Sequence, residues 1–178
     1  MIAAVVATWP LFPRHAESSL VVRVAPEVAF AFLDAHENIA AHMDRPSWAM
    51  LGGTMTSTID KLAGQETGSV IRIAGKVFGI SISLVEKIVE RLPPRRKRWE
   101  TIGTPKLIVM GGYRMGFDIE RAGGGCQVTV VIDYDIPEGL WGSLLGRLFA
   151  RAYARWCLQR IVETVALEFS NATVSHAR

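Results

Sequence analysis

The 178-residue chain has only two cysteines, a small excess of positive charge and no apolar run approaching the ~20 residues of a membrane-spanning helix. Cys126 and Cys157 fit no metal-ligand spacing, and a disulfide framework would need more cysteines. We therefore expect a reducing, cytoplasmic compartment. The formal net charge is +3, and the basic residues do not gather with aromatic stacking motifs, so nucleic-acid binding is not expected.

Signatures of catalysis and of cofactor binding are also lacking. The sequence has no GxxxxGK phosphate loop, and no serine or cysteine sits in a nucleophile-elbow context. His36 and His42 lie near Asp34 and Asp44, but these pairs have no recognised ligand spacing, which favours ordinary surface histidines. The sequence therefore indicates no catalytic residue, no metal ligand and no cofactor.

The first twelve residues are almost wholly apolar, yet they do not read as a signal peptide. No lysine or arginine precedes the apolar run, Pro10 and Pro13 interrupt its end, and no convincing cleavage site follows. We interpret residues 1–15 as an N-terminal extension. Hydrophobic residues make up 49% of the chain and charged residues 21%, which predicts one domain with a real core over residues 16–170 and a tail over 171–178.

The order of the predicted elements is the most informative pattern. A first strand over 16–24 ends at a proline that suits the start of a short helix, and a second short helix is expected over 37–43. A long series of strands follows without a helix among them. A single long helix then covers residues 138–169. The strands are expected over 54–60, 69–74, 80–91, 95–102, 106–120 and 127–136.

The clearest alternation lies in the last two strands. Apolar residues occupy every second position from Tyr113 to Ile119 and again from Val128 to Ile136, and the positions between them are mostly polar. Two such strands joined by a glycine-rich turn predict an antiparallel hairpin that covers a core or a cavity. The predicted fold is α+β: a curved antiparallel sheet of six or seven strands that grips the C-terminal helix, with two short helices at one end. Such a late helix leaves a space between itself and the sheet, which favours binding of an apolar molecule there.

The long helix carries apolar residues in different directions in its two halves. In the second half, residues 158 to 169 form one apolar stripe, and its continuation backwards carries Arg147 and Arg151. The first alternative is a kink or bulge near Trp156, which turns both apolar faces, including Leu145 and Phe149, inward and leaves the arginines exposed. In the second, the arginines point into the cavity and hold a carboxylate or phosphate group, while Leu145, Phe149 and Trp156 meet a partner or a membrane. The sequence leaves both alternatives open.

Three segments resemble a known family. They are RVAPEVAFAFLDAHENIAAHM, the hairpin VEKIVERLPPRRKRWET, and VTVVIDYDIPEG before the terminal helix. Together they are similar to the START-like helix-grip superfamily, which includes pollen-allergen-like proteins and the polyketide cyclase/dehydrase and lipid transport branch. The resemblance implies a bent antiparallel sheet around the C-terminal helix, with a cavity for sterols, lipids, polyketides or similar molecules.

We therefore expect the chain to bind or transport a hydrophobic or amphipathic small molecule in an internal cavity. A cyclase or dehydratase that works without metal in the same cavity is the first alternative. The second is a protein that docks through the C-terminal helix onto a membrane or onto a second subunit, because aromatic residues alternate there with arginines. The residues expected to contact a ligand are Tyr113, Met115, Phe117, Ile132, Tyr134, Leu144, Arg147, Arg151 and Trp48.

Overall fold

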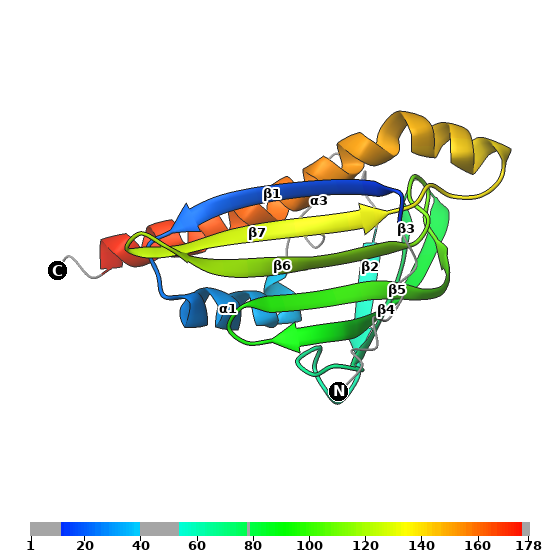
Figure 1. Ribbon diagram of the computed structural model, residues 1–178. Coiled ribbons are helices and arrows are strands. Elements are labelled where there is room, and N and C mark those ends of the chain that lie inside the picture. The colour runs from blue at the N-terminus through cyan, green and yellow to red at the C-terminus, as the bar shows by residue number, and fades with distance from the viewer. Residues whose placement is uncertain (1–11, 40–53, 78, 176–178) are drawn as a thin grey trace, which may run out of the picture.

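The computed structural model describes residues 12–39, 54–77 and 79–175 and shows an α+β protein (Figure 1). One antiparallel sheet of seven strands is followed by a long C-terminal helix. The elements are β1 (Arg14–Val22), α1 (Pro26–Asp34), β2 (Thr54–Ile59), β3 (Val70–Val77), β4 (Ile80–Leu92), β5 (Arg96–Lys106), β6 (Tyr113–Ala122), β7 (Gly125–Tyr134) and α3 (Leu140–Ser175).

The sheet is a run of hairpins that is completed by the N-terminal strand. Its strand order is β1-β7-β6-β5-β4-β3-β2, so consecutive strands are neighbours from β2 to β7, and β1 pairs with β7. In that last pairing Arg14 lies opposite Tyr134 and Val22 lies opposite Cys126. The order leaves β1 and β2 as the edge strands.

The expected α+β architecture is confirmed, and the helix expected after the first strand begins at Pro26 in the first helical position. Residues 36–39 are helical, and the rest of the second short helix expected over 37–43 lies outside the described residues. Two bounds are wrong: the strand expected over 95–102 runs on to Lys106 as β5, and the strand expected over 106–120 begins only at Tyr113 as β6. β5 ends at Lys106 and β6 begins at Tyr113, because the intervening segment leaves the ladder between β5 and β6.

Glycines explain why that segment leaves the ladder. The Gly111 amide donates to the Asp135 carbonyl at 3.0 Å, and the Asp135 amide donates to the Gly112 carbonyl at 2.9 Å. A Cβ atom on Gly111 would lie 3.0 Å from the carbonyl oxygen of Ile136, so a side chain would crowd this close approach. The loop over 107–112 is therefore tied to the segment that leads from β7 to α3.

The core lies on the face of the sheet that α1 and α3 cover. Met115, Phe117 and Ile119 of β6 are buried, as are the alternate residues of β7 from Val128 to Tyr134, which confirms the predicted hairpin. α1 packs on β6 and β7, where the rings of Phe30 and Phe117 meet edge to face with centroids 5.6 Å apart. α3 packs on β1 and β7.

The long helix buries a stripe of small residues in its first half. Ala150 and Ala154 continue the stripe that Leu158, Ile161 and Val165 form in the second half. The buried side therefore keeps one direction along the helix, and the second apolar direction read from the sequence is exposed in the first half. Neither alternative for Arg147 and Arg151 matches in full, because these arginines are exposed and so are Leu145 and Phe149, which a kink was expected to turn inward.

Candidate functional site

A carboxyl group lies on the apolar inner face of the sheet. Glu86 shares this face of β4 with Ile82, Leu84 and Ile88, since side chains of a strand alternate between the two faces. Its residue is only 3% exposed to solvent. A buried carboxyl without a basic partner is costly in a fold, so such a group is a candidate for function.

One oxygen of this carboxyl has a partner and the other does not. The Tyr113 hydroxyl donates a hydrogen bond to Glu86 Oε1. Glu86 Oε2 is fully buried, and no donor among the residues that the structure describes meets hydrogen-bond geometry with it, although the Trp99 indole lies close enough to favour the carboxylate. Burial raises the Glu86 pKa from 4.5 to about 7, and it outweighs the Tyr113 hydroxyl and the Trp99 indole, which both favour the carboxylate.

The surroundings of Tyr113 connect this carboxyl to α3. Burial raises the pKa of the Tyr113 phenol well above its ordinary value, with Glu86, Tyr153 and Cys157 adding to the effect, so the hydroxyl remains a donor. Burial also raises the pKa of Cys157 to about 12, against a hydrogen bond with Tyr153. The Cys157 thiol therefore stays protonated at neutral pH and is a poor nucleophile.

A second buried charge on the same face has partners and serves the fold. Lys97 of β5 donates to the Asp34 carbonyl at 2.7 Å and to Asp34 Oδ1 at 2.9 Å. Arg91 of β4 donates to the same carboxylate at 2.8 Å. Burial tends to raise the pKa of Asp34, but these two cations outweigh it and hold the pKa below its ordinary value. The cluster fixes the end of α1 against the sheet.

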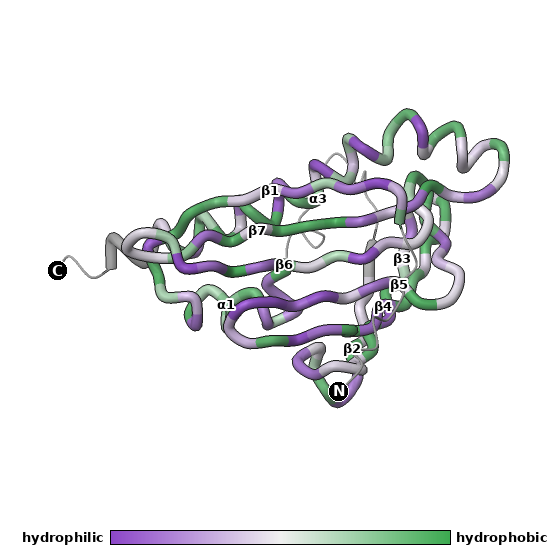
Figure 2. Tube along the Cα trace, viewed as in Figure 1, coloured by the Kyte–Doolittle hydropathy of each residue, from purple (hydrophilic) through white to green (hydrophobic). Residues whose placement is uncertain are grey.

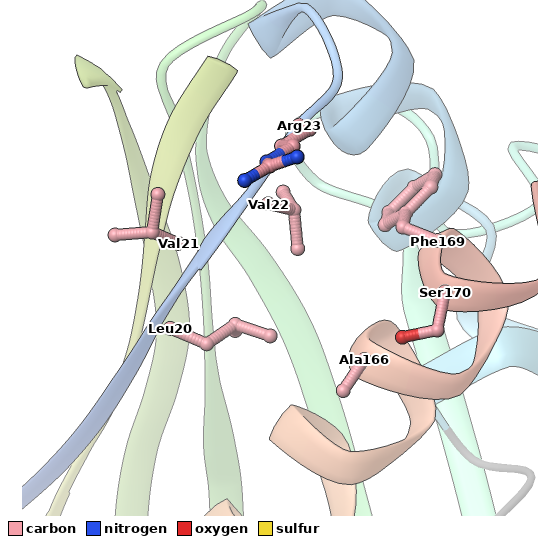
Figure 3. Close-up of a pocket in the computed structure, with 7 residues that line it drawn as sticks. All are labelled: Leu20, Val21, Val22, Arg23, Ala166, Phe169 and Ser170. Carbon is pink, nitrogen blue, oxygen red and sulfur yellow. The ribbon is translucent and has the colours of Figure 1, made fainter. Parts of the chain in front are cut away.

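A groove lies between the edge strand and the end of the long helix (Figure 3). It has a volume of about 290 Å³ and is open to solvent. Its walls are β1 on one side and the last turns of α3 on the other. The lining residues are Leu20, Val21, Val22, Arg23, Ala166, Phe169 and Ser170. None of the residues expected to contact a ligand lines this groove.

The structure brings only part of the expected ligand set together. Four of its members are buried in the core of β6 and β7, namely Met115, Phe117, Ile132 and Tyr134. Tyr113 is half-buried and contacts Glu86. Three members on α3 are exposed to solvent, namely Leu144, Arg147 and Arg151, and Trp48 lies outside the described residues. Whether this set contacts a ligand stays a prediction.

Sequence reasoning missed Glu86, although a signal was present. The strand expected over 80–91 alternates, and Glu86 is in phase with Ile82, Leu84 and Ile88. A carboxylate in phase with three aliphatic residues indicates a charged group on the inner face. The same reasoning applies to β5, where Lys97 is in phase with the buried Trp99 and is therefore also predicted on the inner face.

The described part of the chain holds neither a metal-binding cluster nor a membrane-spanning helix. Over residues 12–39, 54–77 and 79–175, no three His, Cys, Asp or Glu side chains gather where they could hold a metal ion. Over the same ranges, no helix has the length and apolar character needed to cross a bilayer.

Comparison with known families identifies the chain. The model of the family described as polyketide cyclase / dehydrase and lipid transport matches residues 13–167. The chain belongs to this family. The match covers every described strand and most of α3, in agreement with the resemblance read from the sequence. No curated protein matches the chain in sequence.

Solved structures agree with the polyketide cyclase/dehydrase and lipid transport family in fold. Norcoclaurine synthase from Thalictrum flavum, solved with dopamine and hydroxybenzaldehyde, is 12% identical with a TM-score of 0.60, over 93% of this chain and 88% of that one. A protein from Thermus thermophilus, TTHA0849, is 13% identical with a TM-score of 0.58, over 93% and 100%. Ara h 8.0201 is 13% identical with a TM-score of 0.55, over 86% and 97%. At these identities the likeness shows the helix-grip fold alone.

Proposed function

We propose that this protein binds a hydrophobic or amphipathic small molecule between the sheet and α3, and that Glu86 and Tyr113 hold the polar group of that molecule. Membership of a family described by polyketide cyclisation and lipid transport supports an apolar ligand. The apolar surface of the inner face, which includes Met115 and Ile132, supports it as well.

The proposal rests on Glu86 Oε2, the carboxyl oxygen that has no hydrogen-bond partner among the described residues. Buried polar atoms in folded proteins nearly always have a hydrogen-bond partner, because an unpaired one costs about 1–3 kcal/mol. Glu86 Oε2 has none among the described residues, while Oε1 is engaged by Tyr113. A ligand oxygen at Oε2 would satisfy this atom and remove the cost.

The protonation state of Glu86 defines the kind of group that fits. Below a pH of about 7 the carboxyl is protonated, so Oε2 can donate to a carbonyl or hydroxyl oxygen. Above that pH the carboxylate accepts, and a hydroxyl or phenol is the better partner. We therefore propose a largely apolar ligand with one carbonyl, hydroxyl or phenol group. Norcoclaurine synthase, a protein of this fold, was solved with two small aromatic molecules, dopamine and hydroxybenzaldehyde.

A matched pair of naphthalenes tests the proposal. 2-Acetylnaphthalene carries a carbonyl, and 2-ethylnaphthalene has a similar shape without an acceptor. At a pH of about 6, where Glu86 is mostly protonated, we expect the ketone to bind more tightly by about three- to tenfold, the value of one net hydrogen bond. Fluorescence titration or chemical-shift titration measures both affinities.

Two variants separate the role of Glu86 from a general effect. Glu86→Leu removes the donor, so its preference for the ketone should vanish while the hydrocarbon still binds. Glu100→Gln is the control, because Glu100 pairs with Arg114 at 2.7 Å on the other face of the sheet. If neither naphthalene binds the wild type, or if Glu86→Leu keeps the preference, the proposal is wrong.

Acid–base catalysis in the same place is a second candidate. A general acid or base is most effective when its pKa lies near the working pH, and the pKa of Glu86 is about 7. In a cyclase or dehydratase reaction, the Glu86 carboxylate would take the proton on the carbon next to a carbonyl. The electron pair of that C–H bond would pass to the carbonyl to form an enolate.

Exchange of hydrogen for deuterium tests this second candidate with the same ketone. In D₂O the methyl protons of 2-acetylnaphthalene should exchange faster with the wild type than with Glu86→Gln, and the rate should rise with pH around about 7 as the base forms. Equal rates for the two proteins would exclude Glu86 as a base and leave binding alone.

A further inference from the structure

The first half of α3 presents large apolar side chains to solvent. Leu140 is 91% exposed, Trp141 is 79% exposed and Leu148 is 64% exposed. Phe149 follows at 52%. Figure 1 shows that the first turns of the helix extend beyond the end of the sheet, and Figure 2 shows hydrophobic residues along the projecting part. An isolated exposed apolar residue is ordinary, but a group of them on one helix indicates an interaction surface.

The charges on this segment all have the same sign. No Asp or Glu lies between Glu138 and Glu163, while four arginines do. Arg147, Arg151 and Arg155 follow at intervals of four residues, so they form one row along the helix, and all three are exposed. At 100° per residue, Arg151 and Arg155 flank the apolar side of the helix, whereas Arg147 lies nearer the packing side. The segment therefore combines an apolar surface with flanking positive charge.

The direction of the apolar surface distinguishes it from a core-packing face. The helix packs on the sheet through Ala150, Ala154 and Leu158, whereas Trp141, Leu145 and Leu148 lie on the opposite side at 100° per residue. A surface helix of a globular protein usually points polar residues outward. Here the outward side is the apolar one.

We propose that residues 140–155 of α3 form a docking surface for an anionic lipid membrane, on which the helix lies in the interface with its apolar side in the acyl boundary. Charge complementarity favours this partner, since a row of arginines with no acidic residue between Glu138 and Glu163 in the sequence fits a negatively charged surface. The segment does not span the bilayer, because the helix is not apolar enough in the described chain. This proposal does not depend on the ligand site at Glu86.

Vesicle flotation tests it with the full-length protein. We expect binding to vesicles of phosphatidylcholine with about 30% phosphatidylglycerol and little binding to pure phosphatidylcholine. Raising the salt from about 0.1 M to about 1 M shortens the screening length from about 10 Å to about 3 Å and should weaken the binding. Arg151→Gln/Arg155→Gln should lose about fivefold in affinity for each arginine, as about 1 kcal/mol per charge implies.

Serine substitutions separate the apolar contribution from the charge. Trp141→Ser/Phe149→Ser should lose roughly a hundredfold in affinity, because two large side chains no longer enter the lipid. Val28→Ser/Leu167→Ser is the matched control, since both residues are exposed but lie elsewhere, and it should bind like the wild type. Circular dichroism and a thermal melt check that each variant is folded. If Trp141→Ser/Phe149→Ser does not fold, the arginine variant still tests the proposal independently.

Three outcomes would overturn the proposal. The first is that the wild type binds neither kind of vesicle, and the second is that it binds neutral and anionic vesicles equally. The third is that sedimentation shows a dimer which Trp141→Ser/Phe149→Ser converts to a monomer without any vesicle binding. In that case the surface would belong to a second copy of the chain.

Discussion

Replacing Glu86 by glutamine should change the way stability depends on pH. Burial raises the pKa of this carboxyl from 4.5 to about 7, so the folded protein binds its proton more tightly than the unfolded chain does. Stability therefore falls as pH rises through the interval between these two values. Glutamine has nearly the same shape, and its amide oxygen can accept the hydrogen bond from Tyr113, but it has no proton to lose.

The size of the effect follows from the two pKa values. Each pKa unit corresponds to about 1.4 kcal/mol, so the rise from 4.5 to about 7 corresponds to on the order of 3 kcal/mol. We expect the free energy of unfolding of Glu86→Gln, relative to wild type, to increase by this amount between a pH of about 4 and a pH of about 8. The amide protons of glutamine also change the free energy of unfolding by an amount that does not depend on pH. That amount cancels when the values at the two pH values are subtracted.

Urea denaturation at a series of pH values measures the effect. The wild-type curve should lose stability most steeply between pH values of about 5 and 7, and the curve of the variant should lack this loss. Glu100→Gln is the control, because its carboxylate is paired with Arg114, and it should show no such gain at high pH. If Glu86→Gln and wild type keep a constant difference across the whole range, the Glu86 carboxyl is not desolvated and the reasoning is refuted.

Two further predictions concern the neighbours of this site. Tyr113→Phe removes a hydrogen bond that favours the carboxylate, so the Glu86 pKa should rise above about 7 by about one pH unit, measured by carbon-13 NMR of the side-chain carboxyl; an unchanged or lower value would show that the bond is not formed. Gly116→Ala would place a Cβ atom 2.2 Å from the Lys97 carbonyl oxygen and should lower the free energy of unfolding in urea by about 1–3 kcal/mol. Gly124→Ala, with no atom within 4 Å of the added group, should change it by much less, and equal losses would contradict the clash.

The sequence predicted the elements with long, regular patterns. The hairpin of β6 and β7 follows from strict alternation, and α1 follows from a proline at its first position. Both could be predicted from local sequence alone, without knowing what packs against them. The end of β5 could not, because the break before Tyr113 depends on the approach of Gly111 to Ile136 from another part of the chain. The buried stripe in the second half of α3 was predicted, but its continuation through the first half was missed for a related reason. Ala150 and Ala154 carry little hydropathy, and only contact with the sheet shows that they are the buried side.

The candidate site was predictable only in part. Tyr113 was among the residues expected to contact a ligand, since it lies on an apolar strand face where a phenol needs a hydrogen-bond partner. The partner itself, Glu86, lies on another strand, and the hydrogen bond between them depends on how β4, β5 and β6 are placed side by side. Alternation could assign each side chain to a face, but not its distance to a side chain two strands away.

The pairing of β1 with β7 has a consequence for folding on the ribosome. Arg14 lies opposite Tyr134, so the strand that is synthesised first has no sheet partner until almost the last strand has emerged. Contacts so distant in sequence close large loops and are expected to form slowly. Meanwhile the hairpins from β2 to β6 can assemble as they are made, and the apolar side of β1 stays uncovered. A nascent chain that stops before β7 should therefore be a target for chaperones that hold exposed strands, and release should coincide with the synthesis of α3.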